Sequence, residues 1–138
     1  MPIAFSSITD YHKNYTEVHP QKERMEELIT IKEEIREDVL LIRIGGRLDA
    51  ISAPAAEKRL FEFIKNGQVK LMMDLSGTDY LSSAGMRMLI SVTKKLKTLS
   101  GKLVLVSVTH HVMDVLKMAG FDHFLDIAAN EEEGLRKF

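Results

Sequence analysis

Four short apolar runs, separated by longer segments with helical periodicity, most constrain the fold of this chain. The runs lie at residues 39–44, 69–75, 103–108 and 124–127. In the segments between them, apolar residues recur three or four positions apart, which is typical of amphipathic helices. Strands that alternate with helices pair in parallel through right-handed crossovers. The pattern therefore predicts an α/β fold with a largely parallel sheet.

A hairpin is expected before the alternating part. Residues 29–36 alternate apolar and polar side chains, which indicates a half-buried strand, and Glu37-Asp38 offers a turn. The apolar run that follows completes the hairpin, and Gly45-Gly46 is expected to end it. The predicted order of elements is therefore β-β-α-β-α-β-α-β-α.

Each predicted helix begins after a residue that suits a helix start. Ser52 can cap the first helix, with Pro54 in its first turn, and a pair of serines precedes the second. The predicted caps are Ser52, Ser82-Ser83, Thr109 and Asn130, and the first three helices are expected to end at Asn66-Gly67, Ser100-Gly101 and Gly120.

Composition narrows the range of partners. The chain has 138 residues, 45% of them apolar, which fits one compact domain. We assign this domain to residues 28–138. The extension over residues 1–27 is either a mobile tail or docks on the domain or on another copy of the chain. Lys and Arg number 19 against 20 Asp and Glu, so no charge excess favours nucleic acid or an anionic membrane. Cysteine is absent, and neither a membrane span nor a secretory signal is recognisable, so we expect a cytoplasmic protein.

The sequence does not resemble an enzyme. None of its five histidines has a second histidine at the helical spacing that metal sites use. The G-x-S-x-G elbow of hydrolases, the phosphate loop G-x-x-x-x-G-K and the dinucleotide fingerprint G-x-G-x-x-G are absent. We therefore expect no catalytic residues, no metal and no cofactor.

Ser82-Ser83 is the pair of residues most suggestive of function. A serine before a helix is either an ordinary cap or a place where a phosphate is well held, because the first backbone N–H groups of a helix are unpaired and carry partial positive charge. If Ser83 faces solvent, a phosphate there would lie among the N–H groups of Ala84, Gly85 and Met86. Such a charge would suit the folded protein and repel a partner seated on the same surface.

The same helix supplies an apolar surface near these serines. Met86 and Ile90 lie off the expected inward stripe of Leu89, Val92, Leu96 and Leu99, so they either form an exposed patch or pack under the preceding loop. Arg87 could bind a carboxylate of a partner. Asp49, between a strand and a helix, should lie at the same edge of the sheet, either as a turn acceptor or as a contact to a partner.

These segments resemble the STAS family, specifically bacterial anti-sigma factor antagonists, over residues 28–138. The resemblance rests on Gly46-Arg47-Leu48-Asp49, on Asp74-Leu75-Ser76, on YLSSAGMR at residues 80–87 and on Ala119-Gly120-Phe121. It implies a mixed sheet, an initial hairpin followed by parallel strands, with about four helices packed mainly on one face.

The resemblance also implies a partner switch. The unphosphorylated antagonist would bind an anti-sigma factor that is also a serine kinase, and so release a sigma factor. The serine two places before the motif glycine, Ser83 here, would be phosphorylated to end the binding, and a phosphatase of the PP2C type would restore it. Many members have Asp directly before this serine where this chain has Ser82, so Ser82 is a second, weaker candidate.

We therefore predict a regulatory binding protein, with ATP serving only its kinase. The predicted partner-binding residues are Asp49, Ser52, Ser82, Ser83, Ala84, Gly85, Met86, Arg87 and Ile90. Two alternatives remain open: a STAS subunit of another assembly, such as a signalling scaffold or a lipid-transport complex, without a phosphorylation switch, and a nucleotide- or small-molecule-binding sensor.

Overall fold

The computed structural model describes residues 29–138. The predicted extension over residues 1–27 and the start of the domain at Leu28 lie outside this range. The elements in chain order are β1 (Ile29–Arg36), β2 (Val39–Leu48), α2 (Ala53–Lys65), β3 (Lys70–Leu81), α3 (Ser83–Thr98), β4 (Lys102–Val106), α4 (His110–Met118), the 3-10 helix η3 (Phe121–His123), β5 (Asp126–Ala128) and α5 (Glu131–Leu135).

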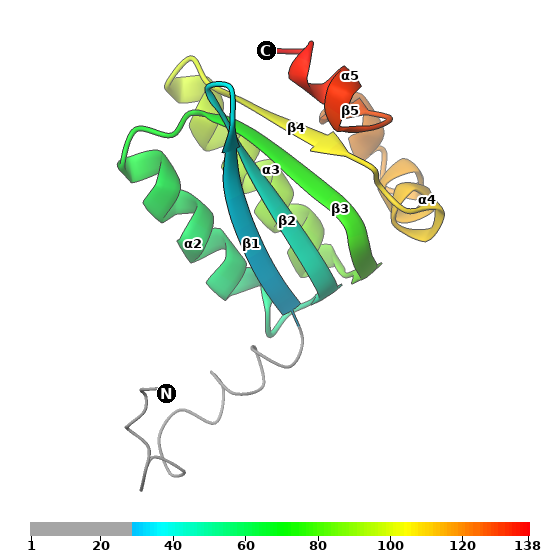
Figure 1. Cartoon of the computed structure of the whole chain (residues 1–138). Coiled ribbons are helices and arrows are strands. Elements are labelled where there is room, and N and C mark those ends of the chain that lie inside the picture. The colour runs from blue at the N-terminus through cyan, green and yellow to red at the C-terminus, as the bar shows by residue number, and fades with distance from the viewer. Residues whose placement is uncertain (1–28) are drawn as a thin grey trace, which may run out of the picture.

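The strands form one sheet in the order β1-β2-β3-β4-β5 (Figure 1). The β1–β2 hairpin is antiparallel, and each later strand pairs in parallel with its predecessor. Neighbouring parallel strands cannot be joined by a tight turn and need a longer crossover connection. A helix therefore lies between β2 and β3 and between each later pair of strands. The predicted mixed sheet is confirmed.

The two faces of the sheet are covered unequally. One face carries Leu40, Ile42, Leu71, Met73, Leu103 and Leu105, and α2, α3 and α4 pack against it with side chains such as Leu60, Leu89 and Leu116. The opposite face carries a smaller cluster of Val39, Leu41, Met72, Val104, Val106 and Ala128, which Leu135 of α5 and Phe138 cover. The expectation of helices mainly on one face is confirmed, and α5 is the helix that lies on the other face.

Strands β2 and β3 are longer than the sequence indicates. The sequence places the ends of these strands at Gly45-Gly46 and at residue 75, but the two strands stay paired to Leu48 and Leu81 across two register shifts. Gly45 and Gly77 lie opposite each other, and a Cβ on Gly77 would stand 3.3 Å from the Gly45 Cα. Beside them, the buried Thr78 hydroxyl donates to the Ile44 carbonyl at 2.7 Å. Close backbone approach and a side-chain hydrogen bond therefore help the strand pairing to continue past these shifts.

Several helix caps are confirmed and some local boundaries differ. The Thr109 and Asn130 side chains accept backbone N–H groups at the starts of α4 and α5. Strand β4 ends at Val106 rather than at residue 108, because Ser107 adopts a left-handed backbone with φ of 55°. The last strand lies at Asp126–Ala128 rather than at residues 124–127, since η3 occupies part of the preceding segment. Leu99, predicted to face inward, is 44% exposed.

Candidate functional site

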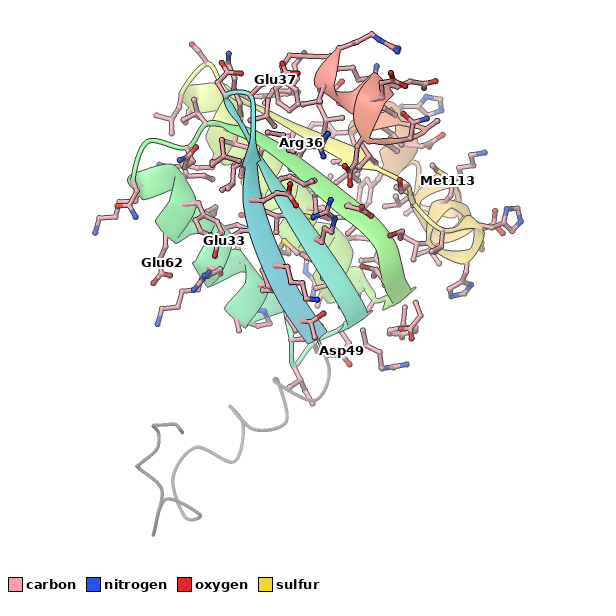
Figure 2. All side chains as sticks on the ribbon, viewed as in Figure 1. Glu33, Arg36, Glu37, Asp49, Glu62 and Met113 are labelled. Atoms are coloured by element: carbon pink, nitrogen blue, oxygen red, sulfur yellow. The ribbon has the colours of Figure 1, made fainter. Side chains whose placement is uncertain are left out.

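The paired ends of β2 and β3 bring the two predicted site segments together. Leu48 pairs with Leu81, and the Ser82 backbone N–H donates to the Leu48 carbonyl at 2.9 Å. Directly after these residues the chain enters the Asp49 turn on one side and α3 on the other. Figure 2 shows Asp49 at this end of the sheet. The common edge predicted for Asp49 and Ser83 is thus the arrangement that the strands impose.

The two serines at the start of α3 have different environments. Ser82 is half-buried, and its hydroxyl accepts the Gly85 N–H at 3.2 Å, so it acts as the N-cap. Ser83 is the first helical residue and its side chain is exposed. Of the two hydroxyls, Ser83 is therefore the one presented to solvent.

The free backbone N–H groups at this helix start are not all the predicted ones. The Gly85 N–H is bonded to the Ser82 hydroxyl, and the Met86 N–H donates to the Ser82 carbonyl at 2.9 Å. The N–H groups of Ser83 and Ala84 have no hydrogen-bond partner among the described residues. The prediction holds for Ala84 and is wrong for Gly85 and Met86, because the Ser82 cap uses their N–H groups.

Gly85 is buried and cannot itself contact a partner through a side chain. A Cβ at this position would stand 2.8 Å from the Leu48 carbonyl oxygen and 2.6 Å from the Leu81 Cδ1. Both distances are shorter than real contacts allow, so only glycine lets the first turn of α3 lie directly on the ends of β2 and β3. Gly85 fixes where Ser83 sits.

The Asp49 side chain organises its own turn. One carboxylate oxygen accepts the backbone N–H groups of Ile51 and Ser52 at 3.0 and 3.1 Å, and the other lies 3.7 Å from the Arg47 Nε. Burial by itself raises the pKa of the Asp49 carboxyl. The hydrogen bonds from Ser52 and Ile51 lower it by more, so the net pKa lies below its ordinary value. Asp49 is therefore a charged turn acceptor whose second oxygen faces the Arg47 guanidinium.

Ser52 is positioned differently from the prediction. Its side chain makes no cap hydrogen bond to α2; instead the hydroxyl donates to the Arg47 carbonyl and accepts the Asp49 N–H at 3.0 Å. Ser52 is fully buried, so it cannot form part of a contact surface. The expected role as a partner contact is corrected to one inside the turn, which holds Asp49 in place.

Arg47 and Tyr80 belong to the same edge, although the sequence did not single them out as site residues. They are register partners at the ends of β2 and β3, and the Arg47 guanidinium lies 4.0 Å from the centre of the Tyr80 ring. Stacking and the nearby Asp49 hold this cation in a fixed place. No local pattern could reveal the pair, because it depends on the register between two strands.

Near Ser83, helix α3 lines two shallow grooves that share Arg87 and Ser91, the first together with α2 and the second together with Phe121 of η3. The first holds about 280 Å³ and is lined by Ala53, Pro54, Glu57, Ala84, Arg87, Met88 and Ser91. The second holds about 420 Å³ and is lined by Arg87, Ile90, Ser91, Lys94 and Phe121. Met86 and Ile90 are half-buried against the core, so they lie between the two alternatives, an exposed patch and a packed position. Arg87 is exposed and lines both grooves.

Two kinds of feature are absent from the described part of the chain. Within residues 29–138, no group of three or more histidine, cysteine or acidic side chains is placed to hold a metal ion. In the same residues, the helices are too short or too polar to cross a bilayer.

Comparisons with known proteins agree with this architecture. The STAS domain profile matches residues 30–134. BtrV of Bordetella bronchiseptica, provisionally named an anti-sigma factor antagonist, is 30% identical over 72% of this chain and 86% of its own length. The anti-sigma-B factor antagonist of Bacillus subtilis is 25% identical over 72% and 91%. The crystal structure of TM1081 from Thermotoga maritima superposes with a TM-score of 0.72 at 22% identity, covering 78% of this chain and 92% of that one.

Proposed function

The chain belongs to the STAS domain family, and from this membership we propose that it is an anti-sigma factor antagonist. In its unphosphorylated form it binds an anti-sigma factor that is also a serine kinase, and the sigma factor is thereby released in the cytoplasm. The observation that carries this proposal is the exposed Ser83 hydroxyl at the edge where the Asp49 turn and the α2–α3 groove meet.

Phosphorylation of Ser83 is the proposed off signal. The Ser83 hydroxyl oxygen attacks the γ-phosphorus of ATP bound to the kinase, the bond to the β,γ-bridging oxygen breaks, ADP leaves, and the hydroxyl proton passes to a base of the kinase. The product carries about 1.5 to 2 negative charges at pH 7. A PP2C-type phosphatase hydrolyses the ester and restores the hydroxyl.

The proposed partner surface is smaller than the residue set expected from the sequence. It comprises the exposed or half-buried residues of the common edge, which are Asp49, Ser82, Ser83, Ala84, Met86, Arg87 and Ile90. The buried Ser52 and Gly85 support this surface from below. A partner on it must cover Ser83, so docking and a charged phosphate exclude each other.

The test begins with capture of the kinase from a native lysate. Ser83→Ala should retain the kinase and resist phosphorylation, whereas Ser83→Asp should bind it at least about tenfold more weakly, a loss of about 1.4 kcal/mol. Incubation with the captured kinase and ATP, followed by mass spectrometry, should place the phosphate on Ser83.

Ser76→Ala is the matched control. This exposed serine lies on β3, the strand that leads into α3, but on the side of the sheet opposite α3. The Ser76→Ala variant should bind the kinase and be phosphorylated on Ser83 like the wild type. A phosphate mapped outside Ser82 and Ser83, or equal kinase binding by Ser83→Asp and wild type, would refute the proposed switch.

A further inference from the structure

Arg87 differs from the other arginines of residues 29–138. Each of the others has an ion pair: Arg36 and Arg43 with Glu131, Arg47 with Asp49, Arg59 with Glu33, and Arg136 with Glu132. Arg87 is exposed and forms no ion pair with any described residue. Because every other arginine of residues 29–138 is paired, Arg87 is available for an anion that the unmodified domain does not supply.

The position of Arg87 on α3 indicates where that anion would be. Arg87 follows Ser83 by four residues within one continuous helix. Residues four apart lie on the same helix face, with their Cβ atoms about 5–6 Å apart. Helical side chains generally lean toward the N-terminus of their helix, which brings the turn that begins with Ser83 within reach of a side chain at position 87.

We propose that Arg87 is the internal ligand of a phosphate on Ser83, and that this pairing withdraws Arg87 from the partner surface. The inference rests on the proposed function, since that function supplies the phosphate. A guanidinium binds phosphate through two parallel N–H donors, which a lysine ammonium cannot reproduce. Arg47 is a poorer ligand, because the Tyr80 ring and the Asp49 carboxylate already hold it.

The consequence for the switch is a double effect. Arg87 lines both grooves beside Ser83, so in the unmodified protein it is placed to bind a carboxylate of a docked partner. Once Ser83 carries phosphate, the same guanidinium is held by its own helix. Phosphorylation then adds a negative charge to the surface and also removes the surface's unpaired cation.

The experiment titrates a phosphate installed without any kinase. Phosphoserine is incorporated at position 83 during translation in wild type and in Arg87→Gln, and phosphorus NMR follows the second ionisation of the phosphate, whose ordinary pKa is about 6. Because an adjacent cation favours the dianion, the phosphate pKa should be lower in the wild type than in Arg87→Gln by about half a unit or more. Arg87→Lys should restore part of this difference.

Two control variants separate this contact from general charge effects. Lys95→Gln removes an exposed cation farther along the same helix and should leave the phosphate pKa unchanged. Arg47→Gln removes the neighbouring cation and should move the pKa by less than Arg87→Gln does. An equal phosphate pKa in Arg87→Gln and wild type, or a larger shift in Arg47→Gln, would overturn the assignment of Arg87.

The titration is independent of the partner. If the kinase modifies Ser83 but the titration shows no Arg87 effect, the role of Arg87 fails and the proposed function stands. If Arg87 lowers the phosphate pKa but no kinase modifies Ser83, the internal pairing stands and the proposed function fails. In unmodified protein, Arg87→Gln should also weaken kinase binding severalfold, and unchanged binding would refute its role in docking.

Discussion

Gly85 shows that a motif residue can act through packing. Alanine in place of glycine normally stabilises a helix by about 1 kcal/mol. Here we expect Gly85→Ala to destabilise the domain by about 1–3 kcal/mol, because the new methyl group would overlap the Leu48 carbonyl and the Leu81 side chain. Urea denaturation measures the change, and Lys95→Ala, an exposed change on the same helix, should stay within about 0.5 kcal/mol. A stabilised Gly85→Ala variant would contradict the packing described for α3.

Asp49 should make stability depend on pH in the acidic range. Its pKa is lowered in the folded state, so the ionised carboxylate stabilises the fold above its unfolded pKa of about 3.9, and this stabilisation is lost as the pH falls through the lowered folded pKa. Asp49→Asn should therefore lose less stability than wild type between about pH 5 and pH 2.5. Urea denaturation midpoints across that pH range measure this loss of stability. Glu62→Gln, an exposed change on α2, should keep the wild-type dependence of stability on pH. The same dependence in Asp49→Asn as in the wild type would disprove the role of the Asp49 charge.

The starts of the helices could be predicted because their signals are local. The Thr109 and Asn130 caps require only the residue and the amide three positions later, and both are present. The true lengths of β2 and β3 could not be predicted, because Gly45-Gly46 alone indicates a strand end. Their continuation depends on Gly77 and Thr78, which are more than thirty residues away in the sequence.

Thr78 should keep the ends of β2 and β3 paired beyond Gly45 and Gly77. Thr78→Val removes the hydroxyl that donates to the buried Ile44 carbonyl, and an unsatisfied buried acceptor costs about 1–3 kcal/mol. We expect faster hydrogen exchange of the amides from Gly45 to Leu48. Thr93→Val is the matched control, because its buried hydroxyl donates to a carbonyl that already has a helical hydrogen bond, so its effect should be smaller. Equal exchange in both variants would argue against a special role for Thr78.

The topology explains why part of the site was foreseeable. Parallel strands end at a common edge, so the order of the elements is enough to place Asp49 and Ser83 together. The burial of Ser52 and the stacking of Arg47 on Tyr80 depend on side-chain packing in the loop and on strand register, which the sequence pattern does not encode. The same holds for α5: its short length gave no indication of the sheet face that it covers.

The position of α5 implies that stability and switching can be altered separately. Glu131 at the start of α5 binds Arg36 of β1 at 2.9 Å and Arg43 of β2 at 3.0 Å, and these side chains are partly exposed. Figure 2 shows Arg36 near the end of β1, far from Asp49. Glu131→Gln should therefore lower the free energy of unfolding by about 1 kcal/mol, which corresponds to about 3–5 °C in Tm.

Salt and a neighbouring residue make this prediction specific. The loss in Tm should shrink in 1 M NaCl, where charges are screened beyond about 3 Å. Glu132 has an 83% exposed side chain, and its one ion pair among residues 29–138 is a 3.9 Å contact to Arg136, so Glu132→Gln should change Tm by less. The rate of Ser83 phosphorylation should stay at the wild-type value in both variants, because α5 and α3 pack on opposite faces of the sheet. A slower rate in Glu131→Gln at a temperature where the protein is folded would show that the two faces are coupled.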